Sequence, residues 1–334
     1  MKDEKLKLVH GGGGEAMHGL LSVLLKKISK KNVAGGIGLA ELDDAATIPF
    51  KGEHLVFTTD SYIVKPVFFP GGDIGKLSMC GTINDLSMMG GRPVAISSAF
   101  IVGAGFPIAD LHRIVESMDA VSREIGVPIV TGDTKVVDGD IGLLVNTAGL
   151  GVAKKVVSDA GLRPGDKVIV SGPVGDHGIA VMSHREGIEF ESSLVSDCAP
   201  LWPMIEKVLK YDLHALKDPT RGGLASCINE MASKAKLDVF LDEDSIPVRD
   251  GVRAASEMLG LDPLSVANEG KAVIGVAPED AKKVLAALKK TKYGRDAALI
   301  GEAKKGRGRV ILETSVGGER LLESPVGDPV PRVC

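Results

Sequence analysis

Aspartates in the N-terminal half are the residues whose type and spacing best suit chemistry. Four of them stand in predicted loops or at strand ends among glycine-rich turns: Asp44, Asp60, Asp85 and Asp133. Carboxylate oxygens suit Mg²⁺, which keeps several waters and bridges nucleotide phosphates. Aspartate is also common in turns and caps for purely structural reasons. The pattern predicts a magnesium–nucleotide site and leaves a structural role as the alternative.

The chain ends in Pro331-Arg332-Val333-Cys334, which places a thiol on a stretch rich in glycine and proline. From Gly317 onward no hydrophobic periodicity is visible, so an extended or mobile tail is expected rather than a packed element. The terminal cysteine is not a prenylation box, which needs three residues after the cysteine. We interpret Cys334 as a reactive thiol on a swinging arm, with a chance placement at the terminus as the alternative.

Two further turns carry residues that suit anion binding or proton transfer. In the turn 218–223, Thr220 can cap the helix that follows, and Arg221 offers a planar guanidinium to a phosphate or carboxylate. In the turn 268–270, Glu269 places an acid before a predicted strand. Both turns are also compatible with ordinary turn chemistry. The glycine-rich stretch 171–178 matches neither a Walker loop nor a dinucleotide fingerprint, and glycines 11–14 are best explained as a flexible leader.

Alternating helices and strands are predicted to position these residues. Hydrophobic spacing predicts helices at 15–31, 73–89, 108–125, 200–211, 222–236, 252–260 and 278–290. Apolar runs predict strands at 55–59, 129–130, 143–151, 167–171, 272–276, 297–300 and 309–312. Such alternation indicates two α/β domains. We expect a leader with the first helix at 1–35, an N-terminal domain with the predicted magnesium–nucleotide site at 36–155, a C-terminal domain at 156–314 and a mobile tail at 315–334.

Composition excludes several classes of protein. The 334 residues carry a net charge of -4, and 4% are aromatic, which argues against nucleic-acid binding and base-stacking platforms. No apolar run is long enough to span a bilayer, and the charged N-terminus predicts no signal peptide. The scattered histidines and the four isolated cysteines predict neither a zinc site nor a disulfide framework. We expect a cytoplasmic protein with reduced thiols.

Taken together, these motifs resemble the HypE family of hydrogenase maturation proteins. The resemblance covers nearly the whole chain and is carried by 10–14 (HGGGG), 58–61 (TTDS), 69–75 (FPGGDIG), 81–86 (GTINDL), 132–135 (GDTK), 218–223 (DPTRGG), 268–270 (NEG) and the terminal PRVC. Several blocks also look like the wider superfamily of aminoimidazole ribonucleotide synthetase, selenophosphate synthetase and thiamine-monophosphate kinase. The terminal cysteine block indicates the HypE family within it.

The resemblance implies an ATP-dependent carbamoyl dehydratase with a two-domain PurM-like fold of the α/β (α+β) class. A carbamoyltransferase, HypF, would load a carbamoyl group onto the terminal thiol. Dehydration would give a thiocyanate, and its cyanide would pass to iron on a HypC–HypD scaffold during maturation of [NiFe]-hydrogenase. The implied assembly is a homodimer formed through the N-terminal sheets, with ATP near the interface.

The resemblance also implies roles for individual residues. Asp44, Asp60, Asp85 and Asp133 would hold Mg²⁺ and ATP, with further contacts from Asn84, Thr220 and Arg221. Lys135 would hold phosphate or the carbamoyl oxygen, Glu269 would act as the base, and Cys334 would carry the substrate. Two alternatives stay open. One is another kinase or synthetase of the superfamily, and the other is a non-catalytic sulfur or metal carrier that uses the tail as a tether.

Overall fold

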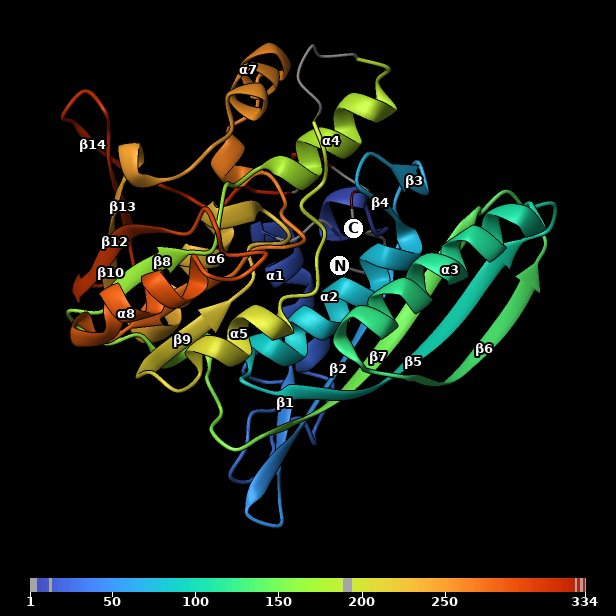
Figure 1. The fold of residues 1–334 in the computed structure, drawn as a ribbon, viewed down its shortest axis with the longest axis horizontal. Coiled ribbons are helices and arrows are strands. Elements are labelled where there is room, and N and C mark those ends of the chain that lie inside the picture. Colours follow the sequence, from blue (N-terminus) through green and yellow to red (C-terminus); the bar gives the residue numbers. More distant parts are fainter. Residues whose placement is uncertain (1–4, 12–13, 189–193, 328, 331–332, 334) are drawn as a thin grey trace.

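The computed structural model describes residues 5–11, 14–188, 194–327, 329, 330 and 333. Two sheets form the centres of two α/β domains that pack side by side (Figure 1). One apolar core contains buried residues of both domains, among them Ile83, Ile96 and Ile179. The predicted fold class, a two-domain mixed α/β fold, is therefore confirmed.

The N-terminal domain contains a five-stranded sheet in the order β1-β2-β7-β5-β6. Its strands are β1 (Ala46–Phe50), β2 (Glu53–Tyr62), β5 (Arg92–Gly103), β6 (Ile129–Val137) and β7 (Leu143–Ala153). Only β5 and β6 are parallel, and α3 (Ile108–Ile125) joins them by the helical crossover usual for parallel neighbours. Helix α3 and α2 (Ile74–Met88) lie over one face of the sheet (Figure 1). The opposite face, here called the open face, exposes Phe57, Ile101 and Leu150.

Helix α2 is buried almost all round because it lies between the sheet and the C-terminal domain. Its N-terminus is capped by Asp73, whose Oδ1 accepts hydrogen bonds from the backbone N–H groups of Gly75 and Lys76. The predicted span of 73–89 agrees with the observed one to within a residue at each end. A short hairpin of β3 (Phe68–Phe69) and β4 (Gly72–Asp73) precedes it.

The C-terminal domain contains a seven-stranded sheet in the order β14-β13-β10-β12-β8-β11-β9. Its strands are β8 (Lys167–Val170), β9 (Leu213–Lys217), β10 (Leu237–Asp242), β11 (Val273–Val276), β12 (Ala298–Lys305), β13 (Val310–Glu313) and β14 (Glu319–Leu321). Its helices are α4 (Asp176–Arg185), α5 (Trp202–Val208), α6 (Gly223–Ala235), α7 (Asp250–Leu259) and α8 (Pro278–Leu288). Among the described helices of both domains, none has the length and hydropathy needed to cross a bilayer.

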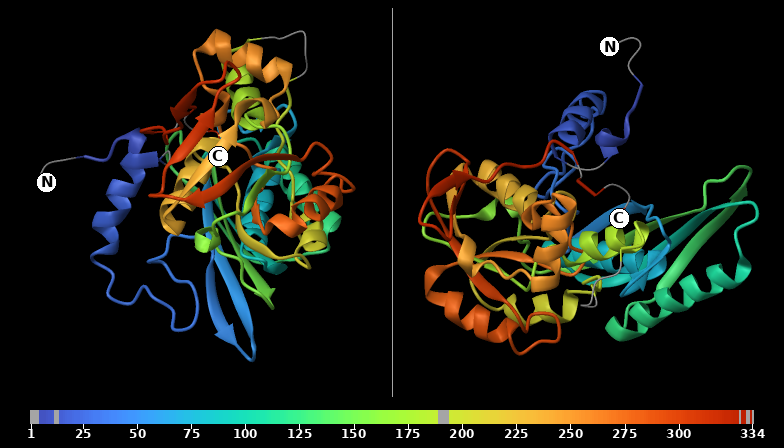
Figure 2. Two further views of the ribbon diagram at one scale, coloured as in Figure 1. Left: turned by 90° about the vertical axis from the view of Figure 1, so that its left-hand side faces the viewer. Right: turned by 90° about the horizontal axis from the view of Figure 1, so that it is seen from above.

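The first helix, α1 (Gly14–Leu25), lies beside the body of the molecule (Figure 2) and is shorter than the predicted 15–31. It ends where lysines replace the apolar face, and the ammonium of Lys31 donates a hydrogen bond to the carbonyl of Leu25. A cation at this position satisfies one of the carbonyls left free at a helix C-terminus.

The C-terminal segment differs from the unpacked tail that the sequence predicts. Strand β14 pairs with β13, and Leu322, Val330 and Val333 are buried. Val330 and Val333 belong to the apolar core that both domains share. Gly and Pro composition excludes a helix here, but an extended chain can bury single side chains without any periodicity. The described part of the tail is thus a packed element.

Candidate active site: a buried acid cluster between the domains

Three of the four predicted aspartates lie together on the helix-covered side of the N-terminal sheet. Asp60 is on β2, Asp85 is on α2 and Asp44 precedes β1. The carboxyl groups of Asp60 and Asp85 are within hydrogen-bonding distance, and the Thr58 hydroxyl donates to Asp85 Oδ2 at 2.9 Å. The Tyr62 hydroxyl donates to Asp60 Oδ2 at 3.4 Å. Adjacent elements therefore converge their carboxylates on one buried region.

A fourth acid, Asp218, completes this cluster from the C-terminal domain. It directly follows β9 and is buried, and its charge raises the pKa of Asp85 and of Asp44. Although its turn was singled out in the sequence, Asp218 itself was not predicted as a site residue. The signal that could have found it is its position at a strand end directly before Pro219.

Asp44, Asp60, Asp85 and Asp218 are here called the acid cluster, and burial and repulsion between carboxylates raise the pKa values of Asp44, Asp85 and Asp218. For Asp85, burial is the largest cause, followed by the charges of Asp60 and Asp218. Burial also raises the pKa of Asp44, and it raises the pKa of Asp218 to about 6. Buried like charges that lack enough counter-charge favour uptake of protons or of a cation.

The residues present fit a magnesium-bound nucleotide. Asp44 Oδ2 and Asp218 Oδ2 are buried and have no hydrogen-bond partner. Within the described residues, no three His, Cys, Asp or Glu side chains are already arranged to hold a metal ion. Mg²⁺ is usually bound through one or two carboxylates, with waters and substrate phosphates as the other ligands. The acid cluster therefore suits Mg²⁺ that arrives with phosphate oxygens rather than a resident metal.

Lys217 is the buried cation of the cluster and was missed in the sequence. Its Nζ lies 2.6 Å from Asp44 Oδ1, 3.2 Å from Asp159 Oδ2 and 3.3 Å from Glu230 Oε2. Burial lowers its pKa, but these three carboxylates raise it more, so the lysine stays charged. Nothing in its sequence context distinguishes it from the other lysines, apart from its place directly before Asp218.

Glu269 is buried beside the cluster, and its Oε1 has no hydrogen-bond partner. Burial raises its pKa well above the usual value, and the Cys198 thiol and Asp218 raise it further. Its backbone N–H donates to Asp197 Oδ1 at 3.0 Å, and Asp197 is itself paired with Lys271 at 2.8 Å. The turn is therefore held rigidly while its carboxyl group stays free to exchange a proton.

Asn84, which was predicted to contact the nucleotide, is hydrogen-bonded to the backbone in this structure. Its Nδ2 donates to the carbonyls of Ala199 and Glu269, and its Oδ1 accepts from the N–H of Leu201 at 2.8 Å. These partners are all backbone groups of the C-terminal half. These three hydrogen bonds hold the backbone of the Glu269 turn against α2, and the nucleotide contact of Asn84 stays a prediction.

Thr220 and Arg221 lie in the loop before α6, where Arg221 contacts α1. The Arg221 guanidinium lies 3.6 Å from Met17 Sδ and lowers the pKa of Glu269 by its charge. The predicted helix cap at Thr220 is not formed, because the N-cap residue of α6 is Gly222 in the left-handed region at φ 72°. The structure brings this loop to the Glu269 side of the site.

Asp133 and Lys135 do not join the acid cluster within one copy of the chain. They lie on β6 in register with Ala99 and Ile101 of β5, which places them on the open face. Lys135 Nζ is 2.7 Å from Asp133 Oδ2, and both side chains are more than half exposed. β6 is also three strand spacings from β2, roughly 14 Å. Asp133 therefore cannot share one metal ion with Asp60 in the same chain.

Cys334 lies outside the described residues, but the preceding Val333 is described and fully buried. The other three cysteines, Cys80, Cys198 and Cys227, are free thiols and buried. Any chemistry that needs an accessible thiol would therefore not use these three in the folded state.

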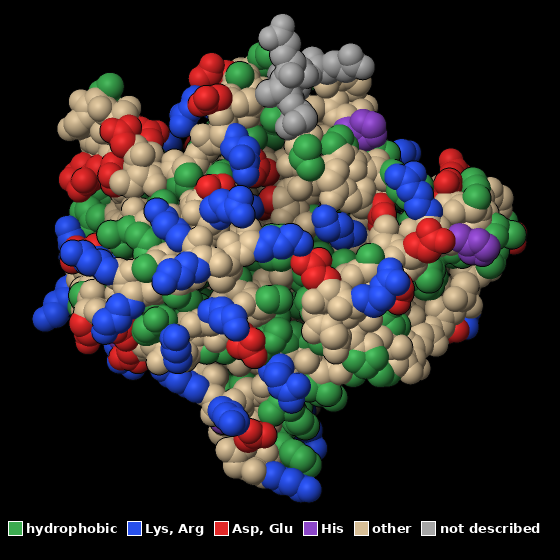
Figure 3. Space-filling view, in the orientation of Figure 1, with side chains coloured by type: hydrophobic (Ala, Val, Ile, Leu, Met, Phe, Trp, Pro, Cys, Tyr) green, Lys and Arg blue, Asp and Glu red, His purple; other side chains and the backbone are tan. Residues whose placement is uncertain are grey.

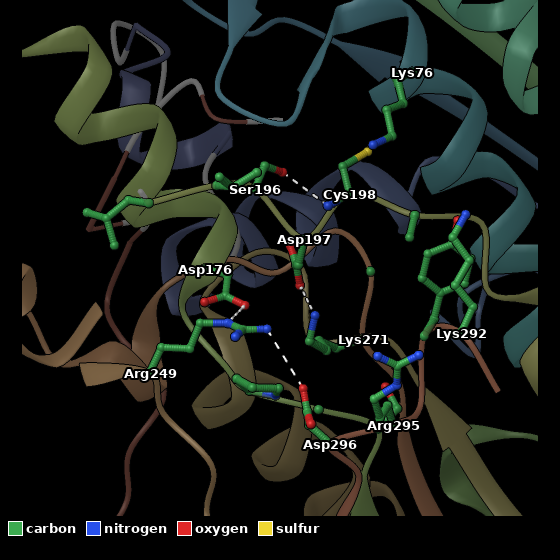
Figure 4. Close-up of a pocket in the computed structure, with 18 residues that line it drawn as sticks. Lys76, Asp176, Ser196, Asp197, Cys198, Arg249, Lys271, Lys292, Arg295 and Asp296 are labelled. Atoms are coloured by element: carbon green, nitrogen blue, oxygen red, sulfur yellow. Dashed lines mark hydrogen bonds and ion pairs between the residues drawn. The ribbon is translucent and has the colours of Figure 1, made fainter. Parts of the chain in front are cut away.

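A cavity of about 540 Å³ lies between the two domains (Figure 4), and none of the predicted site residues lines it. Its wall includes the segment 194–199, here called the connecting segment, and charged side chains such as Lys76, Lys271 and Arg249. The Cys198 thiol hydrogen-bonds with that of Cys80, which, together with burial, raises its pKa well above the usual value. The cavity thus adjoins the Glu269 turn through Cys198 and Gly270 without containing the acid cluster.

Comparisons with known proteins agree with this geometry. Residues 42–153 match the AIR synthase related protein N-terminal domain, and residues 163–313 match its C-terminal domain. Over 99% of its length the chain is 47% identical to a putative hydrogenase expression/formation protein of Methanocaldococcus jannaschii, all of which is covered. It is 45% identical over 99% of its length to carbamoyl dehydratase HypE of Rhizobium leguminosarum, 95% of which is covered.

Two solved structures are similarly close. A HypE–HypF complex matches with a TM-score of 0.86 and 41% identity, covering 92% of this chain and 99% of the other. Hydrogenase maturation protein HypE in complex with ATP matches with a TM-score of 0.82 and 42% identity, covering 99% of this chain and 100% of the other.

Proposed function

The chain belongs to the HypE family of carbamoyl dehydratases within the AIR synthase related proteins, and we propose that it uses ATP to dehydrate an S-carbamoyl group on Cys334. The product is a thiocyanate, and its cyanide becomes a ligand of the iron of [NiFe]-hydrogenase during maturation. The observation that carries the proposal is the placement of Val333, one residue before the thiol, in the core that both domains share. Val333 thereby lies in a core formed by the two domains that supply the acid cluster and Glu269, which supports this proposal.

The acid cluster is proposed to bind the nucleotide through Mg²⁺. Asp44 and Asp218 each present a buried oxygen without a partner, and Asp60 and Asp85 lie beside them. When bound, Mg-ATP supplies the phosphoryl group that turns the carbamoyl oxygen into a leaving group, and the ion offsets the phosphate charge. Lys217 stays charged and holds Asp44 in place.

Glu269 is proposed as the base that removes amide protons. The carbamoyl C–O bond breaks, the oxygen leaves with phosphate, and loss of both amide protons completes the C≡N bond. A buried carboxyl group with a raised pKa binds a proton more tightly than an exposed one, which suits this task near neutral pH. Asn84 and Asp197 act on it only by holding the backbone of its turn.

We propose a homodimer formed through the open face of the N-terminal sheet. Apolar side chains are exposed on this face of the sheet. Others reach the surface on the projecting β1–β2 hairpin (Figure 3). Phe57, Ile101 and Leu150 are each more than a third exposed. Asp133 and Lys135 share that face, so each would serve the nucleotide bound by the partner copy. Lys135 would there hold phosphate or the carbamoyl oxygen.

The proposed partners follow from the chemistry of the thiol. A carbamoyltransferase, HypF, loads Cys334, and a HypC–HypD scaffold accepts the cyanide. A related HypE has been solved in complex with HypF, which supports the first partner. Both partners need the thiol outside the interdomain core, so the tail must leave the position described here. A reduced thiol is required throughout, which favours the cytoplasm as the compartment.

Intact-mass measurement of the full chain tests the proposal. With HypF, carbamoyl phosphate and ATP, the protein should gain the mass of one carbamoyl group and then lose the mass of one water. Cys334→Ser is the matched control and should show neither change. With a non-hydrolysable ATP analogue added after loading, the carbamoyl mass should persist. Loss of water in that sample, or loading of Cys334→Ser, would contradict the proposal.

A further inference from the structure

The end of the tail is held by a hydrogen-bonded histidine that none of the roles above uses. His177 is in the first turn of α4 and fully buried. Its Nε2 lies 2.7 Å from the carbonyl oxygen of Val333, and its Nδ1 lies 2.8 Å from the hydroxyl oxygen of Ser196. The backbone N–H of Cys198 donates to the same hydroxyl oxygen at 3.1 Å (Figure 4).

These contacts select one tautomer of the ring. A carbonyl oxygen can only accept, so Nε2 must carry the proton and donate it to Val333. Nδ1 is then the acceptor, and the Ser196 hydroxyl donates to it while accepting from Cys198. Burial lowers the pKa of His177, which keeps the ring in this neutral form. Each of the four groups has a partner in one consistent chain of hydrogen bonds.

The surroundings of the ring belong to both domains. Phe69 of β3 meets the imidazole edge-on, with ring centroids 5.4 Å apart. The side chains of Val330 and Val333 are fully buried in the same core. The helix that carries His177 packs closely on Val266, since a Cβ atom at Gly178 would lie only 2.4 Å from Val266 Cγ1. We call the group of His177, Ser196 and Phe69, which surrounds the docked end of the tail, the tail seat.

The tail seat is joined to the Glu269 turn by the connecting segment. Ser196 contacts the tail seat histidine, and the adjacent Asp197 accepts the backbone N–H of Glu269. Ala199 N–H donates to the carbonyl of Glu269 at 3.3 Å. Residues 196–199 therefore contact both the histidine that holds the tail and the backbone of the proposed base, Glu269.

We propose that His177, supported by Ser196, is a positioning residue that fixes the backbone next to Cys334 and so sets where the terminal thiol stands. The effect of this docking on catalysis rests on the proposed function, whereas the docking itself does not. His177 touches neither substrate nor nucleotide in this assignment. It acts through its hydrogen bond to the carbonyl oxygen of Val333, the residue directly before the thiol.

The test compares the full-length protein with His177→Leu, Ser196→Ala and His177→Gln. Alkylation of Cys334 by a neutral thiol reagent in the presence of ATP is followed by peptide mass. His177→Leu should raise that rate about tenfold, because it leaves the buried Val333 carbonyl without a donor. Ser196→Ala should raise it less, about threefold, since the ring stays in place. His177→Gln should restore much of the protection, because a glutamine amide can donate from a similar position.

A matched control is His214→Leu. His214 is a nearly buried histidine on β9 of the same domain; its side chain is bonded to Asp166 and Asp212 rather than to the tail. This variant should lose stability while its Cys334 alkylation rate stays at that of the wild-type protein. In His177→Leu the KM for ATP should be unchanged and kcat should fall, since nucleotide contacts are intact while the thiol is misplaced.

Equal alkylation rates in the wild-type protein and His177→Leu would overturn the proposal. So would protection that His177→Gln fails to recover although the variant unfolds at the wild-type temperature. Because alkylation needs no carbamoyl transfer, it separates the two hypotheses. Altered alkylation without any carbamoyl dehydration in the wild-type protein would leave the docking standing and remove the proposed function.

Discussion

The two sides of the N-terminal sheet hold acids of the same type in opposite electrostatic states. On the helix-covered side, burial raises the pKa of Asp85, and neighbouring carboxylates raise it further. On the open face, the pKa of Asp133 is lowered by its hydrogen bond from Lys135. Among the buried acids Asp44 is paired with Lys217, yet the pKa of Asp44 is still raised, whereas the exposed Asp133 is paired with Lys135 and its pKa is lowered. Residue type and glycine-rich context look alike in both places, so the face of the sheet decides the chemistry.

The largest expected effect comes from disturbing the buried side. Asp85→Asn removes a charge from the acid cluster, and ATP-dependent dehydration should fall below about a hundredth of the wild-type rate, because Mg²⁺ loses a carboxylate ligand. Carbamoyl loading by HypF should continue, since Cys334 is untouched. Single-turnover mass measurement and calorimetric titration with Mg-ATP check both parts. Unchanged Mg-ATP affinity would show that the cluster does not hold the nucleotide.

Glu269→Gln should be the next most severe change. It keeps the size and one hydrogen-bond acceptor of the side chain but removes the proton acceptor, so dehydration should slow about a hundredfold or more. Mg-ATP affinity should stay near that of the wild-type protein, in contrast with Asp85→Asn. A loss of nucleotide binding equal to that of Asp85→Asn would assign Glu269 to the acid cluster instead of to proton transfer.

Mixing two inactive variants tests whether the exposed pair serves the partner copy. Lys135→Ala and Asp85→Asn proteins, each inactive, are unfolded together and refolded at equal concentrations. If Lys135 completes the other protomer's site, half of the dimers are mixed and each has one intact site, so about a quarter of wild-type activity should return. If each site uses residues of one chain only, no activity returns. Wild-type protein refolded alone is the control for recovery.

The smallest effect concerns pH and stability. The pKa of Asp218 is about 6 in the folded protein, above its unfolded value of 3.8. A group with a raised folded pKa binds more protons when folded, so its presence lowers stability as pH rises from about 4 through 6. Asp218→Asn should therefore be more stable than the wild-type protein at pH 7, by at most about 3 kcal/mol, and equally stable at pH 4.

Urea unfolding at the two pH values, without nucleotide, measures this difference. Asp140→Asn is the control, because Asp140 is exposed in the loop between β6 and β7 and should change neither value. A stability gain for Asp218→Asn that is the same at pH 4 and pH 7 would show that repulsion by a buried charge is not its cause.

Elements with strong local patterns could be predicted from the sequence. The span 108–125 is observed unchanged in α3, which buries Ile114, Met118 and Val121 of the predicted apolar face. Strands β5, β9 and β10 were not predicted. In these strands apolar and polar residues alternate weakly, or both faces of the strand are buried, as in β9 from Ala215 to Lys217. Such runs have no clear hydrophobic period from which a strand could be predicted.

The sequence by itself determined the residue types of the site, the local helices and the terminal thiol, because caps, periodicity and motifs depend only on neighbouring positions. Only the tertiary structure decided that Asp218 and Lys217 join Asp44, and that Asp133 faces away from them. It also decided that Val333 is docked against His177. These outcomes depend on which face of a strand a residue occupies and on contacts between residues more than a hundred positions apart, which no local pattern encodes.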